Sequence, residues 1–184
     1  VKIFPIVLII SVQLNNRYGY LQIKNGSSFI IHAEIEKTLM PDIRNNLERI
    51  KFESSKGVMV ETPPMVIESE ASIFWRAKVI NSTDKPQFCQ ISIIGTKDAV
   101  KKNIHTTFSK ERFSPERTKW HLKNYLVSNA EDFIPKTSVF KSVIVDYERA
   151  AYPFIAWDAD PIILYFIFTL ILCLVFMPML KVTI

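Results

Sequence analysis

Glycine is scarce in this chain of 184 residues, which contains only Gly19, Gly26, Gly57 and Gly95. No two of them lie close together. Phosphate-binding loops and dinucleotide fingerprints need clustered glycines, because their backbone must turn tightly and approach the phosphates closely. The sequence therefore excludes the classes of nucleotide enzyme that use these loops.

Cysteine is also rare. Cys89 lies in a segment with strand periodicity, and Cys173 lies within an uninterrupted apolar run. A disulfide between them would require the strand to enter the lipid in which the apolar run is expected to lie. We therefore expect two unpaired thiols.

Catalytic and metal-binding patterns are missing. His32, His105 and His121 are far apart, and none has a cysteine or carboxylate at metal-ligand spacing. A G-x-S-x-G nucleophile motif is absent. Glu34 and Glu36 share one face of a predicted strand, but they have no second convergent group for acid–base chemistry. We therefore expect no metal, no cofactor and no small-molecule substrate, and the chain is not expected to be an enzyme.

Charge is absent from residues 161–180, which read PIILYFIFTLILCLVFMPML. A helix of this length spans roughly 30 Å, the thickness of the bilayer's hydrocarbon core. The run predicts a transmembrane helix that follows an interfacial linker, residues 151–160, and precedes a short cytoplasmic tail, residues 181–184. The residues predicted to lie at the membrane interface are Tyr152, Trp157, Asp160, Tyr165 and Lys181; Asp160 is also predicted to cap the helix.

Residues 1–14 are mostly apolar but too few to span a bilayer. Three interpretations remain open: the end of a first transmembrane helix, the core of a signal peptide, or a buried strand. The first is favoured because of the hydrophobicity of the segment.

Between these ends, residues 15–150 have the composition of a water-soluble domain. Alternating apolar residues predict strands over 28–36, 72–80 and 88–94. Two further short strands are predicted over 58–61 and 65–68, and a last strand over 137–147. Residues 41–50 have helical spacing. The expected fold is mainly β: a small Ig-like β-sandwich with one or two short helices.

Residues 101–125 contain seven Lys and Arg against two Glu. Ser114-Pro115-Glu116 has the pattern of a helix start, so a basic helical segment is expected within 101–128. The interleaved basic and aromatic residues suit an acidic partner or anionic lipid; nucleic acid is least favoured, and a solvated face is the simplest alternative. The candidate contact residues are Lys101, Lys102, Lys110, Arg112, Arg117, Lys119, Trp120 and Lys123.

Several short motifs follow one another along the chain in the order typical of one group of proteins. They are VMVETP at 58–63, FWR at 74–76, SVIVDY at 142–147, and a Tyr-Pro step before the final apolar run. The chain thereby resembles uncharacterised bacterial membrane proteins in which two transmembrane helices flank an extracytoplasmic β-domain. The resemblance implies a place in the bacterial inner membrane. The apolar run has Asp158 and Asp160 before it and Lys181 after it, so the positive-inside rule predicts the soluble domain on the extracytoplasmic side. It implies no catalytic residues.

These patterns predict a non-catalytic accessory subunit of a larger integral-membrane complex, whose partners are the lipid bilayer and other membrane subunits. The alternative is a membrane-tethered binding module that uses the basic surface of residues 101–123. An enzyme is the third hypothesis.

Overall fold

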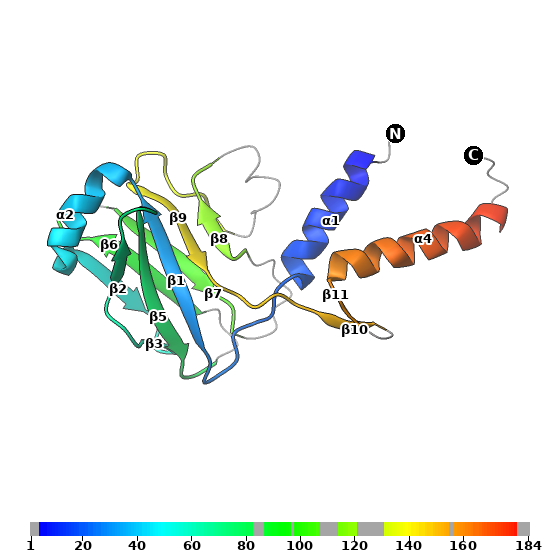
Figure 1. Ribbon diagram of the computed structural model, residues 1–184, viewed down its shortest axis with the longest axis horizontal. Helices are drawn as coiled ribbons and strands as arrows, with labels where there is room; N and C mark the ends of the chain where they lie inside the picture. Colours follow the sequence, from blue (N-terminus) through cyan, green and yellow to red (C-terminus); the bar gives the residue numbers. More distant parts are fainter. Residues whose placement is uncertain are drawn as a thin grey trace. The chain divides into compact units, whose positions relative to one another are not determined.

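The computed structural model describes residues 4–82, 87–96, 98–106, 114–120, 131–154 and 157–179, and the fold is mainly β with a few short helices (Figure 1). The chain divides into two compact units, which are described separately. Residues 22–148 form the sandwich unit, and residues 1–21 together with 149–184 form the terminal unit.

The larger sheet of the sandwich unit is antiparallel throughout. Its central strand pairs on both sides with long strands, and the short strands lie toward the borders of the sheet. The order is β3 (Val58–Val60), β5 (Ser72–Val79), β1 (Ser28–Ile35), β9 (Phe140–Val145) and β8 (Glu116–Thr118), with β4 (Met65–Ile67) also paired to β5.

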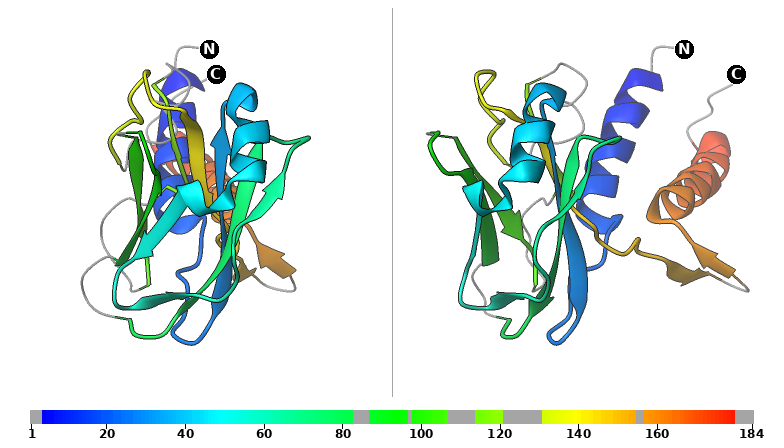
Figure 2. Two further views of the ribbon diagram at one scale, coloured as in Figure 1. Left: turned by 90° about the vertical axis from the view of Figure 1, so that its left-hand side faces the viewer. Right: turned by 60° about the vertical axis from the view of Figure 1, so that its left-hand side comes forward.

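The smaller sheet consists of β2 (Ile50–Ser54), β6 (Gln87–Ile93) and β7 (Ala99–Ile104), in that order. Figure 2 shows the two sheets as separate layers. The ring of Phe52 from the smaller sheet lies 5.2 Å, centroid to centroid, from that of Trp75 in the larger sheet.

The core lies between the layers and is filled by every second residue of the long strands, as the side-chain period of two requires. Each fully buried aliphatic side chain contributes about 1.5–3 kcal/mol of transfer free energy. The completely buried members include Ile31, Ala33, Ile35, Ile73, Ala77, Val79, Ile91, Val143 and Val145.

One short helix connects the strands where helical spacing predicted it. Helix α2 (Met40–Asn45) has Pro41 in its first turn, and it buries Met40 and Ile43. The 3-10 turns Lys37–Leu39 and Leu47–Arg49 flank it.

The terminal unit combines both ends of the described chain. Helix α1 (Phe4–Tyr18) contacts helix α4 (Pro161–Met179), and β10 (Tyr152–Phe154) and β11 (Trp157–Ala159) form a hairpin. The Ala150 N–H donates to the carbonyl of Gly19, which ties the two ends together.

The predicted transmembrane helix is not found. Within the described part of the chain, no helix is long and apolar enough to cross a membrane, so this prediction for residues 161–180 is wrong. Helix α4 has 19 residues. Residues 1–14 lie mostly within α1, which has 15 residues and is therefore shorter still.

The predicted helix within 101–128 is also contradicted where the structure describes it. Residues 101–104 belong to strand β7, and residues 116–118 form β8. Ser114 does make the hydrogen bond typical of a helix start, since its Oγ accepts from the Glu116 N–H at 3.3 Å. The chain nevertheless continues as a strand because β8 pairs with β9. Residues 107–113 and 121–130 lie outside the described residues.

Candidate functional site

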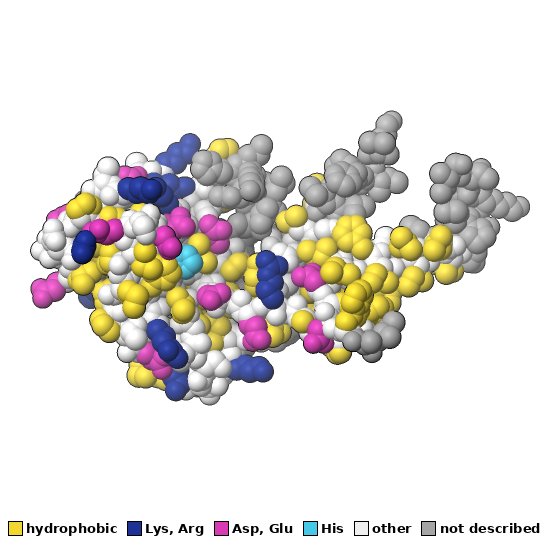
Figure 3. Space-filling model, in the orientation of Figure 1, with side chains coloured by type: hydrophobic (Ala, Val, Ile, Leu, Met, Phe, Trp, Pro, Cys, Tyr) yellow, Lys and Arg dark blue, Asp and Glu magenta, His cyan; other side chains and the backbone are white. Residues whose placement is uncertain are grey.

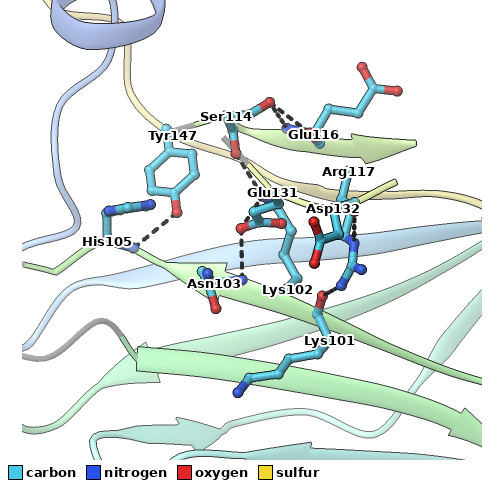
Figure 4. A network of polar contacts seen from close by, with 10 residues as sticks. All are labelled: Lys101, Lys102, Asn103, His105, Ser114, Glu116, Arg117, Glu131, Asp132 and Tyr147. Atoms are coloured by element: carbon cyan, nitrogen blue, oxygen red, sulfur yellow. Dashed lines mark hydrogen bonds and ion pairs between the residues drawn. The ribbon is translucent and has the colours of Figure 1, made fainter. Parts of the chain in front are cut away.

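A cluster of polar side chains lies inside the sandwich unit, around Lys102 (Figure 4). Strand β7 alternates, and Val100, Lys102 and Ile104 occupy its buried positions. Lys102 is 0 % exposed. Lysine is almost never fully buried unless it is paired, so its partners decide what the cluster can do.

Two oxygen atoms accept hydrogen bonds from the Lys102 ammonium. Its Nζ lies 2.6 Å from the carbonyl oxygen of Ser114 and 3.1 Å from Oε1 of Glu131. Glu131 is itself almost enclosed, with 8 % of its side chain exposed. The same Oε1 accepts from the backbone N–H of Asn103 at 3.0 Å. The pair therefore joins β7 to two other segments of the chain.

Tyr147 and His105 lie in the same part of the core. The Tyr147 hydroxyl accepts a hydrogen bond from the backbone N–H of His105 at 3.1 Å. Burial raises the pKa of Tyr147 above its usual range. Burial, with a smaller contribution from the Lys102 charge, lowers the pKa of His105 to about 4. Both side chains are therefore neutral at pH 7.

The thiol of Cys89 lies on β6 and is 0 % exposed. Burial raises its pKa to about 12, although the nearby Lys102 charge acts in the opposite direction. Burial lowers the pKa of Lys102, and the carboxylate of Glu131 opposes that shift. A protonated thiol in a dry core is not nucleophilic. The arrangement is therefore suited to bracing the sandwich and not to attacking a substrate.

Arg117 adds a second brace at the border between the sheets. Its Nε donates to the carbonyl of Asp132 at 2.6 Å, and its Nη1 donates to the carbonyl of Lys101. The guanidinium thus links β8 to β7, which is an edge strand of the smaller sheet. Occupying a carbonyl on that edge leaves less of it free for pairing with another chain.

Among the described residues, no group of three or more His, Cys, Asp or Glu side chains could hold a metal ion. The Glu131 carboxylate is already paired with Lys102.

The structure separates the predicted basic contact residues. Lys101 is exposed, and its Nζ lies 4.0 Å from the centroid of the Phe88 ring. Lys102 is in the core, and Arg117 bonds to backbone carbonyls. Lys119 pairs with Glu36 at 3.6 Å. Trp120 is 47 % exposed. The remaining three, Lys110, Arg112 and Lys123, lie outside the described residues.

The residues predicted at a membrane interface belong to the terminal unit. Tyr152 and Trp157, on the two hairpin strands, are 40 % and 59 % exposed. Asp160 caps α4, since its Oδ1 accepts from the Ile162 N–H at 2.8 Å. The Tyr165 carbonyl accepts from the Thr169 hydroxyl at 2.7 Å. Lys181 lies outside the described residues.

The sequence reasoning did not identify Glu131, Tyr147 and His105 as neighbours of Lys102. One signal was present: Lys102 occupies an inward position if 99–104 is read as an alternating strand. A lysine at that position requires a buried partner, but the partner is 29 residues away, and the sequence has no pattern that identifies it.

No protein-family model, curated protein or solved structure shows detectable similarity to this chain. The structure defines a mainly β protein with a braced sandwich. The resemblance to two-helix bacterial membrane proteins stays a prediction.

Proposed function

We propose that this protein is a non-catalytic accessory subunit that docks to a larger complex through helix α4. The observation that carries the proposal is the apolar surface of that helix. Large hydrophobic side chains project into solvent along most of its described length, with exposures between 47 % and 62 %: Ile163, Phe166, Phe168, Leu170, Ile171, Leu172, Leu174, Val175 and Phe176.

These side chains surround the helix. Leu170, Ile171 and Leu172 are consecutive, so they point about 100° apart, and Leu174, Val175 and Phe176 repeat the pattern one turn later. A helix that is apolar on all sides is normally enclosed by other protein or by an apolar medium. Contiguous apolar surface of this kind marks an interaction site. A partner that fits α4 therefore encloses it, as a groove between apolar helices does.

The polar groups of α4 support docking by packing alone. The Thr169 hydroxyl donates to the carbonyl one turn earlier, and Asp160 satisfies a donor of the first turn. Residues 161–180 have no charged side chain. The proposed partner is consequently a hydrophobic helical subunit, of the kind that integral-membrane complexes contain.

The buried cluster supports the non-catalytic part of the proposal. Its thiol is protonated, its histidine is neutral, and its lysine is paired inside a closed core. The alternative binding module is less favoured, because Lys102 is buried and Arg117 and Lys119 are engaged by neighbouring residues.

The test is assembly of the tagged full chain in its source cells, followed by mild detergent extraction and sedimentation. We expect a particle larger than the 21.3 kDa chain that contains a constant set of other subunits. Replacing Leu170 and Leu174, one turn apart on α4, by aspartate should release the chain as a monomer. The matched control is Ile94→Asp, because Ile94 is 55 % exposed but lies in the sandwich unit.

Two outcomes would contradict the proposal: a wild-type chain found only as a monomer, or an α4 variant that still assembles. Replacing Lys101 and Lys119 by glutamate, which reverses their charge, distinguishes the accessory subunit from the alternative binding module. An accessory subunit keeps its assembly after this change, whereas a basic binding module loses its ligand.

A further inference from the structure

The outer face of the larger sheet carries a row of large side chains across four strands. His32 on β1 is the register partner of Phe74 on β5 and of Ile144 on β9. Phe74 in turn pairs with Met65 on β4. Register partners on one face are in side-chain contact distance, so Met65, Phe74, His32 and Ile144 form one continuous row, which we call the outer row.

This row breaks the usual alternation of an antiparallel sheet, whose solvent face is polar. Met65 is 65 % exposed, and Ile30, two residues before His32 on the same face of β1, is 45 % exposed. Figure 3 views this face and shows hydrophobic side chains gathered over β5 and β1, with acidic groups beside them. Neither the core nor the buried cluster accounts for these apolar residues.

The centre of the row is a stacked aromatic pair. The rings of His32 and Phe74 are stacked, with centroids 5.0 Å apart and an angle of 28° between their planes. A stacked pair on a rigid central part of the sheet presents apolar area without a large loss of side-chain freedom on binding. Such anchors commonly dominate the energy of an interface.

Acidic groups border one end of the row. Glu116 on β8 is the register partner of Ile144, and Glu34 lies two residues after His32 on the same face of β1. Burial raises the pKa of Glu116, and the charge of Glu34 raises it further. The two carboxylates are therefore close enough to interact. Beside the row, Arg76 on β5 is the register partner of Ile30 and pairs with Glu61 at 3.1 Å.

We infer that the outer row is a docking site for a basic, amphipathic segment of a partner protein. The apolar side chains of that segment pack on Phe74, His32 and Ile144, and its lysine or arginine side chains meet Glu34 and Glu116. The whole chain has a formal net charge of +5, so a basic segment is repelled overall and is attracted only where acids gather. Charge complementarity of this kind selects the partner and its orientation. The inference does not depend on helix α4.

The probe is a fluorescent synthetic peptide of leucine and lysine with helical amphipathic spacing, compared with the same peptide carrying glutamate in place of lysine. Binding to the full chain is followed by fluorescence anisotropy. We expect the basic peptide to bind and the acidic peptide not to bind. Phe74→Ser and Met65→Ser should each weaken binding about tenfold. The pair Glu34→Gln and Glu116→Gln should weaken it by a similar factor and remove most of its salt dependence.

The matched controls lie away from this face: Ile94→Ser, which removes an exposed apolar side chain, and Glu48→Gln, which removes an exposed acid. Near-UV circular dichroism verifies that each variant is folded, and Met65→Ser tests the apolar row at its most exposed residue. The inference is overturned if both peptides bind equally, if neither binds, or if the variants bind as the wild type does. Concentration-dependent self-association that Phe74→Ser abolishes would also overturn it, because the occupant would then be a second copy of this chain.

Discussion

Removing the charge of Glu131 tests whether the Lys102–Glu131 pair braces the sandwich. Glu131→Gln keeps the size of the side chain and an oxygen that can still accept from Asn103, so it changes little except the charge. Lys102 would then be 0 % exposed without a counter-charge. Breaking a buried pair in this way costs about 3–5 kcal/mol, and we expect a loss near 3 kcal/mol in the free energy of unfolding because the Ser114 carbonyl still accepts from Nζ.

The converse variant, Lys102→Met, removes the cation and leaves the Glu131 carboxylate with the hydrogen bond from the Asn103 N–H. A similar loss is expected. Combining the two changes leaves no buried charge, so the double variant should recover to within about 2 kcal/mol of the wild type. The coupling energy between the two positions is then at least about 4 kcal/mol, so the two changes are far from additive.

The assay is equilibrium unfolding in urea, followed by near-UV circular dichroism, to which the buried ring of Trp75 contributes. The control is Glu68→Gln in the exposed Arg44–Glu68 pair, which should cost less than about 1 kcal/mol. Single variants that each cost less than about 1 kcal/mol, or a double variant equal to their sum, would refute the brace.

Three further outcomes follow from the cluster and from the cap of α4. His105 has a pKa of about 4 in the folded chain and about 6.5 when unfolded. As the pH falls, the unfolded chain therefore takes up this proton before the folded chain does. Its stabilising contribution is complete above pH 6.5 and is lost as the pH falls toward 4; His105→Gln should therefore flatten the pH dependence of the urea midpoint across this window. Cys89, with a pKa of about 12 and no exposed surface, should resist iodoacetamide at pH 8 until urea unfolds the chain; mass spectrometry showing prompt alkylation would contradict this. Asp160→Ala should cost about 1 kcal/mol at the first turn of α4, seen as faster amide exchange near that turn, and Asp160→Ser should restore protection.

Periodicity predicted the strands whose two faces differ clearly. The strands expected over 28–36, 72–80 and 88–94 are confirmed as β1, β5 and β6. Each buries alternate residues, so the sequence pattern reflects the physical environment directly. The mainly β class is confirmed for the same reason.

The prediction failed where long-range pairing outweighs a local signal. Ser114 makes its local hydrogen bond with Glu116, but the following residues are held by β9 and by the backbone carbonyls that Arg117 reaches. These partners are distant in the sequence, and no local pattern of a single sequence predicts them. Strand β7 was missed because Lys101 and Lys102 obscure the alternation of its buried residues.

The buried cluster was beyond sequence reasoning for a related reason. Lys102 and Glu131 are 29 residues apart in the sequence and are brought together by the folded sandwich. Each looks like an ordinary surface residue in the sequence, since charged residues are rarely enclosed. Only the three-dimensional pairing distinguishes them from their exposed neighbours.

The composition of the terminal unit has a consequence for biosynthesis. Helices α1 and α4 contact each other although roughly 140 residues separate them along the chain. Because domains generally form as units while the ribosome advances, residues 22–148 can complete their sheets while α1 still waits for its partner. During this interval the part of α1 that α4 contacts in the complete chain is uncovered, and it is a natural target for a chaperone. A ribosome stalled after residue 150 would therefore hold a folded sandwich with an unshielded first helix.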